Sequence, residues 1–142
     1  MSTEELLKQF GEHIGIRHLR LEVNRSCQLR FGDDLWVIIN EVNAERLLLN
    51  AVVGRIPPQT ADQLAFTLLN MNMLFAHVEG PYVTCEPERN IIMLSRALEI
   101  AGLDVLAIEE NISYLLQNVE HIRVILQEKG ISLDMEDVED LS

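Results

Sequence analysis

The side chains that could carry acid–base, nucleophilic or metal chemistry are scattered along this sequence. His13 and His18 are five residues apart near the end of an expected helix, a spacing that gives poor geometry for a shared metal ion. His77 ends a second expected helix, and His121 lies within a third. Little polarity converges around any of them, so we interpret each as a partly exposed helix residue rather than a ligand.

The remaining candidates are an aspartate pair and two cysteines. Asp33 and Asp34 are adjacent, but aspartates at a turn between strands ordinarily serve the turn itself. Cys27 and Cys85 lie in strand-like runs, where a free cysteine behaves as a small hydrophobe; the alternative is one disulfide between them. The sequence contains no glycine-rich phosphate loop, nucleophile elbow or metal-binding cysteine cluster. We therefore predict a protein that is not an enzyme and uses no cofactor or metal ion.

Composition and charge narrow the class of partner. The chain has 142 residues, of which 48% are apolar, as expected for one folded domain. A net charge of −12 would repel phosphate backbones and anionic lipids, so we expect neither nucleic acid nor membrane as a partner. The start of the chain lacks the features of a signal peptide, and no apolar run is long enough to span a bilayer. We expect a cytoplasmic protein with reduced thiols.

Hydrophobic periodicity predicts an α+β domain with the order α-βββ-α-ββ-α and a twisted antiparallel sheet. We expect helices over Ser2–His13, Thr60–Val78 and Asp104–Lys129, and strands over Cys27–Phe31, Leu35–Val42, Glu45–Val53, Tyr82–Glu86 and Ile91–Ile100. Capping boxes at Ser2–Glu5 and Thr60–Gln63 mark two helix starts, and Ile16–Val23 favours a short extended segment. We assign residues 1–130 to a single domain and residues 131–142 to an acidic, mobile tail.

The expected helix Thr60–Val78 is apolar on two opposite sides. At about 100° per residue, one stripe carries Leu64, Leu68, Met71, Phe75 and Val78, and the opposite stripe carries Phe66, Leu69, Met73 and Ala76. A helix that is apolar all round is buried on all sides. We expect the first stripe to face the core and the second to meet another cover, or the reverse. A symmetric homodimer is the commonest such cover.

The first three strands also present two apolar faces. We expect a two-residue loop at Asn43–Ala44, which pairs Val42 with Glu45 and fixes the register. The core face would carry Leu35, Val37, Ile39, Leu48 and Val52, and the partly uncovered face would carry Trp36, Ile38, Leu47, Leu49 and Ala51. A three-residue first turn adds Cys27, Leu29 and Phe31 to the core face. One small domain cannot cover all of this surface, and exposed apolar patches indicate protein–protein contact.

Several short motifs carry a resemblance to a known family. They are Cys27-x-Leu29-x-Phe31 with Asp33–Asp34, Glu45–Arg46–Leu47–Leu48–Leu49, Gly54-x-Ile56–Pro57, a helix with Leu68, Leu69 and Leu74–Phe75, and Ile91–Ile92–Met93–Leu94. From about Leu6 to Leu126 the sequence resembles the type III secretion chaperones that serve individual effectors, the class I or Tir-chaperone family. Two turns depart from the family pattern: Glu79–Gly80–Pro81 replaces a glycine pair, and Pro87–Asn90 lacks a glycine.

The resemblance implies a homodimeric, non-enzymatic chaperone of the bacterial cytoplasm, associated with virulence. It would bind the N-terminal region of one or a few secreted effector proteins, keep it extended and soluble, and present it for secretion. The secretion-system ATPase is a further implied partner. Mapped by position, the effector-binding residues are Leu6, Phe10, Trp36, Ile38, Leu47 and Leu49. The central helix would lie at the twofold interface through Phe66, Leu69, Met73 and Ala76.

Two other hypotheses belong to different classes. A dimeric α+β adaptor or regulatory domain that binds a folded protein partner would explain the same apolar surfaces. A small enzyme would need a pocket with converging titratable groups, and the sequence indicates none.

Overall fold

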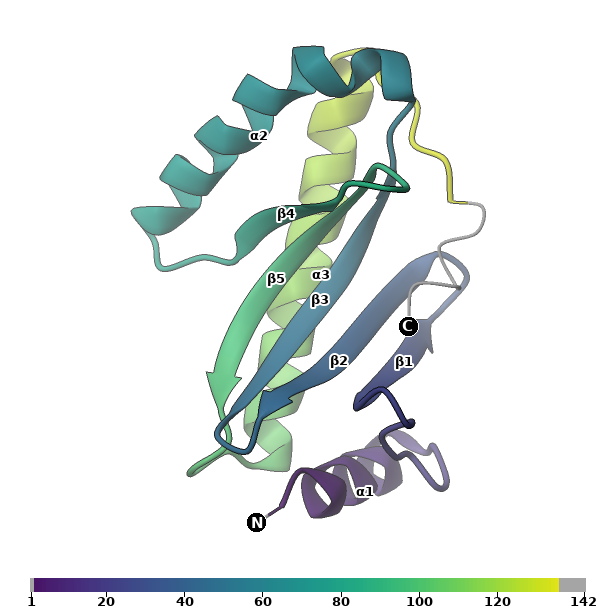
Figure 1. Cartoon of the computed structure of the whole chain (residues 1–142), viewed down its shortest axis with the longest axis vertical. Helices are drawn as coiled ribbons and strands as arrows, with labels where there is room; N and C mark the ends of the chain where they lie inside the picture. The colour runs from purple at the N-terminus through teal and green to yellow at the C-terminus, as the bar shows by residue number, and fades with distance from the viewer. Residues whose placement is uncertain (1, 136–142) are drawn as a thin grey trace.

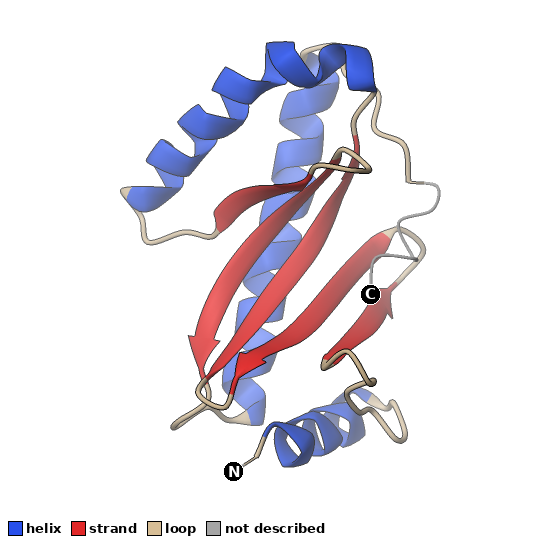
Figure 2. Ribbon diagram, in the orientation of Figure 1, coloured by secondary structure: helices blue, strands red, loops and turns tan. Residues whose placement is uncertain are grey.

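The strands of the protein form a single antiparallel sheet. They are β1 (Ser26–Phe31), β2 (Leu35–Asn43), β3 (Arg46–Arg55), β4 (Tyr82–Glu86) and β5 (Ile91–Glu99). Their order across the sheet is β1-β2-β3-β5-β4 (Figures 1 and 2). This computed structural model describes residues 2–135, except for the side chains of Ala61 and Gln63. All five expected strands are present, which confirms the predicted element order and fold class.

Within residues 2–135, three α-helices pack around this sheet. They are α1 (Thr3–Ile14), α2 (Ala61–Ala76, preceded by the 3-10 turn Pro58–Thr60) and α3 (Val105–Glu128). Figure 1 shows α3 lying along one face of the sheet and α1 at one end of it. α3 buries one apolar stripe there: Ile108, Ile112, Leu115, Val119, Ile122 and Leu126. α2 lies beside β4, and its far end stands away from the sheet (Figure 1).

Two of the predicted helix starts are capped by side chains, and one is not. The hydroxyl of Ser2 accepts a hydrogen bond from the Glu5 N–H, and the carboxylate of Asp104 accepts one from the Ala107 N–H. The predicted cap at Thr60 is wrong: its hydroxyl donates to the Pro57 carbonyl, in the 3-10 turn that precedes α2. Gly130 closes α3, since its φ of 78° is the left-handed conformation that glycine adopts without strain.

The predicted register of β2 on β3 is wrong by one residue. The loop is Ala44–Glu45 rather than Asn43–Ala44, and Asn43 closes it by accepting a hydrogen bond from the Glu45 N–H. Next to the loop, this change shifts the β2–β3 pairing by two residues. A bulge between Glu41 and Asn43 adds an extra residue on β2 and reduces the shift to one residue over the rest of the strands, so that Ile39 faces Leu49 instead of Leu48.

Because side chains alternate along a strand, the one-residue slip exchanges the two faces of β3. Leu47, Leu49 and Ala51 lie in the core under α1 and α3, together with Val37 and Ile39. Leu48 and Val52 lie on the opposite face, which we call the outer face. The first turn has three residues, as predicted, and places Cys27, Leu29 and Phe31 on the core face.

Two further segments differ from expectation. Residues 16–23 form turns and irregular backbone rather than a strand. They close over Gly11, where a Cβ would lie 2.7 Å from the Ile16 carbonyl oxygen. Helix α2 ends at Ala76, so Val78 lies beyond the buried stripe and is 66% exposed.

The two turns without the expected glycines are closed by other residues with positive φ. Asn90 has φ 56° in the β4–β5 turn, and Glu79 has φ 53° before β4. Asparagine tolerates this conformation better than most residues. The hairpin therefore forms without a glycine.

Candidate interaction surfaces

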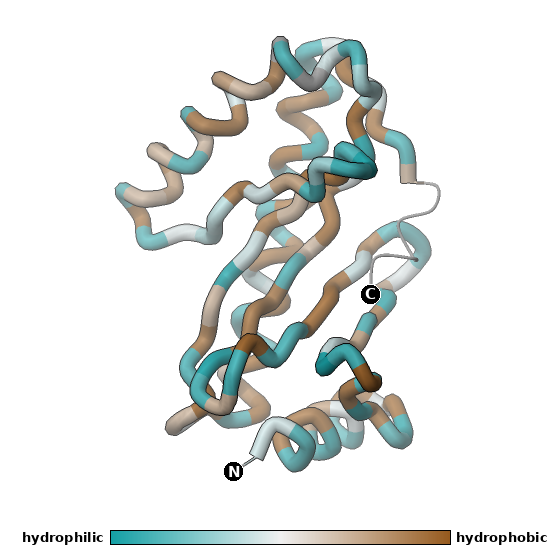
Figure 3. The backbone as a smooth tube through the Cα atoms, in the orientation of Figure 1, coloured by the Kyte–Doolittle hydropathy of each residue, from teal (hydrophilic) through white to brown (hydrophobic). Residues whose placement is uncertain are grey.

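The second apolar stripe of α2 is exposed. Phe66 is 82% exposed, Leu69 63% and Met73 58%, and Ala76 is exposed beside them. The opposite stripe packs inward as predicted, with Leu64 and Met71 buried and Leu68 and Phe75 half-buried. Figure 3 shows apolar segments along α2 where it stands clear of the sheet. Near the C-terminal end of α2, three further large apolar side chains are exposed: Leu74, Val78 and Tyr82.

Asn72 fixes α2 to the edge strand β4. Its amide oxygen accepts a hydrogen bond from the Val83 N–H at 2.6 Å, and its amide nitrogen donates to the Val83 carbonyl at 3.2 Å. The side-chain amide thus satisfies the outward-facing backbone groups of Val83 as a neighbouring strand would. Sequence reasoning missed Asn72, since a lone polar residue in an apolar helix gives no indication of its partner.

The outer face of the sheet carries a second, smaller apolar cluster. Ile38, Val52 and Ile91 form its buried centre, and Trp36, Met93 and Met135 pack around it. The Arg30 guanidinium lies over the Trp36 ring, 5.1 Å from its centroid, in a cation–π contact. Trp36 itself is half-buried.

A ladder of polar side chains crosses four strands beside this cluster. Asn50 donates to the Asn40 amide oxygen at 3.0 Å and accepts from the Ser95 hydroxyl at 2.6 Å. The Ser95 and Thr84 hydroxyls lie 2.8 Å apart. Asn50 and Ser95 are buried, and hydrogen bonding is what makes burial of such groups tolerable. The ladder joins β2, β3, β5 and β4 on the outer face.

The structure separates the predicted effector-binding residues into two groups. Trp36 and Ile38 lie on the outer face, as expected, although Ile38 is only 4% exposed. Leu47 and Leu49 are fully buried in the core, which corrects their assignment to the same face as Trp36. Leu6 and Phe10 are also buried, because the apolar side of α1 packs against the main core.

The residues screened for chemistry do not converge on a site in the described part of the chain. The backbone carbonyls of Asp33 and Asp34 accept hydrogen bonds from Arg30 and Arg123, and the Asp34 carboxylate lies 3.4 Å from Arg123. Burial, followed by the charge of Glu22, raises the pKa of the Cys27 thiol to about 12, whereas reactive thiols have lowered values. Cys27 and Cys85 are both free. Residues 2–135 hold no group of three or more His, Cys, Asp or Glu side chains suited to a metal ion. None of the described helices is long and apolar enough to cross a membrane.

Comparison with known proteins identifies the family. The sequence pattern of the Tir chaperone protein (CesT) family matches residues 5–123. The chain belongs to this family. The Tir chaperone of Escherichia coli O157:H7 is 26% identical over 134 residues, which cover 94% of this chain and 85% of that protein. The Tir chaperone of Citrobacter freundii is 25% identical over the same shares of the two chains. The predicted family is therefore confirmed.

Solved structures share the fold of this Tir-chaperone family member. A chain of the ExsC–ExsE complex superimposes with a TM-score of 0.72 at 24% identity, covering 89% of this chain and 97% of that one. A chain of the HopA1–SchA chaperone–effector complex gives a TM-score of 0.71 at 18% identity, covering 84% and 91%. At these identities the superpositions establish the α+β fold with three helices and a five-stranded sheet.

Proposed function

We propose that this Tir-chaperone family member binds the N-terminal region of one or a few secreted effector proteins of a type III secretion system. It keeps that segment extended and soluble and presents it for secretion. The observation that carries the proposal is the family match over residues 5–123. Relatives of the same fold support it, because one is a chain of a chaperone–effector complex. Binding needs no nucleotide, since a partner that binds only the non-native segment stabilises it by mass action.

The exposed stripe of α2 supports a homodimer. Phe66, Leu69, Met73 and Ala76 form one apolar strip on a helix whose other side already packs inward. A twofold axis across this strip would bury the same residues from both copies in one self-complementary contact. The two copies would then present two outer faces to one extended effector segment.

Within each copy, the outer face offers the contact surface for the effector. Trp36 presents an aromatic side chain that is half-buried in the free protein, and Ile38 lies beside it. Leu6 and Phe10 would reach an effector only if α1 left the core, and Leu47 and Leu49 only if the sheet opened. We therefore assign direct contact to Trp36, whereas Ile38, which is 4% exposed, would reach an effector only if the side chains packed around it moved.

The remaining features follow from the role. The effector segment must be bound before export, which places the protein in the bacterial cytoplasm. The ATPase of the secretion system is the expected receiver of the loaded complex. No catalytic role is proposed, because a chaperone of this kind acts by binding alone.

Purification of the tagged protein from its native cells, grown under secretion-inducing conditions, tests the proposal. Bound proteins are identified by mass spectrometry, and the complex is then subjected to limited proteolysis. An effector chaperone should protect an N-terminal segment that is cleaved rapidly when the effector is alone. A partner that resists cleavage equally when free would instead favour an adaptor domain that binds a folded protein.

A further inference from the structure

The last residues of strand β3 pair with β5 on one side but extend beyond β2 on the other. The last β2–β3 pair is Val37 with Ala51, whereas β3 continues to Arg55 beside β5. The chain returns to this open edge after α3 (Figure 1). Arg55 and Asp134 exchange two backbone hydrogen bonds, each 2.9 Å long, in an antiparallel bridge. The segment that contains Asp134, residues 131–135, takes the position that a longer β2 would occupy; we call it the C-terminal strap.

Three apolar side chains of the strap pack against the rest of the domain. Ile131 and Leu133 pack against the main core, and Met135 packs against the outer cluster of Ile38, Val52 and Ile91. Leu133 and Met135 approach Gly54, where an added Cβ would lie 3.1 Å from Leu133 Cβ and 3.2 Å from Met135 Sδ. A glycine at this position therefore lets the strap lie close to β3. The contacting pattern is apolar, acidic, apolar at consecutive positions.

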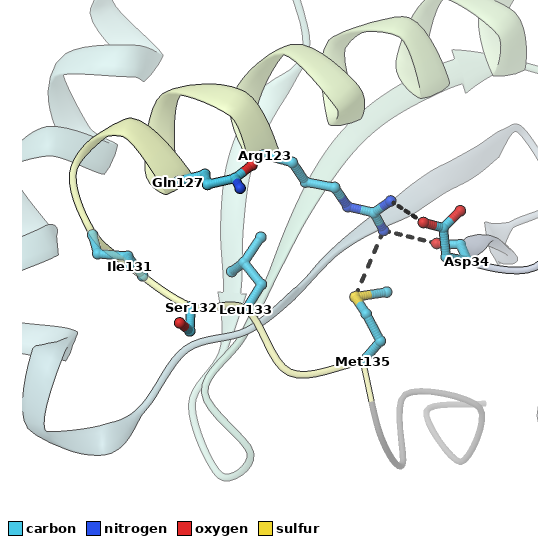
Figure 4. A pocket seen from close by; sticks show the side chains of 7 residues that line it. All are labelled: Asp34, Arg123, Gln127, Ile131, Ser132, Leu133 and Met135. Carbon is cyan, nitrogen blue, oxygen red and sulfur yellow. Dashed lines mark hydrogen bonds and ion pairs between the residues drawn. The ribbon is translucent and has the colours of Figure 1, made fainter.

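The residues beneath the strap are linked mainly by the side chain of Arg123, which belongs to α3. Arg123 donates to the carbonyls of Val53 at 2.9 Å, Asp34 at 2.8 Å and Val52 at 3.3 Å, and lies 3.4 Å from the Asp34 carboxylate. Figure 4 shows its guanidinium between Asp34 and Met135. The strap contributes only a weak sulfur contact of 3.7 Å to this arginine. The edge would therefore keep its shape after the strap left.

The strap does not fill the space available to it. A pocket of about 350 Å³ lies along it, lined by Asp34, Arg123, Gln127, Ile131, Ser132, Leu133 and Met135. One bridge pair, one ion pair of 4.0 Å and three apolar side chains still make a smaller contact than the ladders between full strands, such as the nine pairs of β3 with β5. Local segments with few buried contacts open at low free-energy cost.

We propose that the open edge of β3 is a strand-acceptor site, that the C-terminal strap occupies it in the free protein, and that an extended effector segment replaces the strap. The inference rests on the proposed function. Backbone hydrogen bonds at a sheet edge accept any extended segment, and pockets for alternate side chains select its sequence. The segment that fits has apolar residues two positions apart with an acidic residue between them, because Asp134 lies beside the Arg55 guanidinium, 4.0 Å from its Nη1 atom. The tethered strap competes with the effector at a high effective concentration and so prevents weak binding.

A labelled peptide copy of residues 130–142 tests the site without any effector. Fluorescence anisotropy measures its binding to the full-length protein and to the full-length double variant Leu133→Asp/Met135→Asp, whose own strap is released. The double variant should bind the peptide at least tenfold more tightly than the unmodified protein. A peptide with the same two aspartates should not bind, whereas one with Leu133→Val and Met135→Leu should bind as well as the original. In the full-length protein, Asp134→Pro removes the N–H that donates to the Arg55 carbonyl. This variant should therefore also bind the peptide more tightly than the unmodified protein.

Equal peptide binding by the unmodified protein and the double variant would overturn the proposal, because the strap would then not occupy the site. Absence of binding to a double variant with an unchanged circular dichroism spectrum would also overturn it. If the double variant is unfolded, the Asp134→Pro variant decides by the same criteria. Failure here leaves effector co-purification unaffected, so the strap and the proposed function can fail separately.

Discussion

Arg25 Nη2 lies 2.6 Å from Glu41 Oε1, and the same nitrogen lies 2.8 Å from Glu4 Oε1. One arginine in the loop before β1 thus joins the first turn of α1 to β2. The hydrogen bond from Thr3, followed by that from Arg25, lowers the pKa of Glu41. The hydrogen bond from Arg25 lowers the pKa of Glu4 as well. These contacts hold α1 against the end of the sheet.

Acid should weaken this attachment, and Glu41→Gln should remove the part of the pH dependence that comes from Glu41. A carboxyl with a lowered pKa in the folded state adds stability above its ordinary value of 4.5, and that stability is lost as the pH falls through the folded-state pKa. At pH 7 the variant should melt below the unmodified protein, and the two melting temperatures should converge below pH 4.5. Thermal unfolding across this pH range measures the difference. A difference that stays constant with pH would show that the Glu41 charge does not contribute.

A charge on the exposed stripe of α2 should separate the proposed dimer. Leu69→Asp and Met73→Asp place a carboxylate in the twofold contact, where it would be buried without a partner. Light scattering coupled to gel filtration should give the mass of a dimer for the unmodified protein and of a monomer or aggregates for these variants. Gln117→Glu is the control for an added charge, because Gln117 is exposed on α3 rather than on α2. A soluble monomer in the unmodified protein would count against the α2 interface.

Leu47→Asp and Trp36→Asp should have different effects. Leu47 is fully buried, so an aspartate there should prevent folding or destabilise the protein by about 3 to 5 kcal/mol. Trp36 is half-buried on the outer face, and its replacement should leave the helical circular dichroism signal intact while weakening effector binding at least tenfold. Effector retention by folded Trp36→Asp at the level of the unmodified protein would remove the outer face from the proposed contact.

The polar ladder should contribute to stability through its middle member. Asn50→Ala leaves the Asn40 amide oxygen without its donor and the Ser95 hydroxyl with Thr84 as its remaining partner, at a cost of about 1 to 3 kcal/mol. Asn40→Ala removes only the end of the ladder and should cost less. Urea unfolding of the two variants gives both free energies. Equal losses would mean that the Asn50–Ser95 hydrogen bond adds no stability beyond the Asn40–Asn50 bond.

The sequence predicted the elements better than their pairing. Strand alternation and the helical stripes depend on local periodicity, so β4 and the two sides of α2 were predictable from residue types. The β2–β3 register depended on the Ala44–Glu45 loop and on a bulge near Val42, and neither leaves a periodic pattern. The one-residue error in this register is the reason why Leu47 and Leu49 were predicted on the outer face although they lie in the core.

Contacts between distant segments were beyond sequence reasoning for a different reason. Val83 offers only its backbone N–H and carbonyl to the Asn72 side-chain amide, and Asp134 and Arg55 pair through backbone groups that almost every residue carries. The residue types at these positions therefore give no signal of the pairing. The strap falls in the region predicted to be a mobile tail; residues 131–135 lie on the sheet, and residues 136–142 of that prediction lie outside the described residues.

The most direct test of the account is the identity and binding region of the protein retained by the tagged chain in its native cells under secretion-inducing conditions. We predict one or two secreted proteins, each bound through an N-terminal segment that proteases cleave only in the absence of this chain, and a large loss of both with Trp36→Asp. Retention of no secreted protein, or binding through a folded domain elsewhere in the partner, would contradict the account.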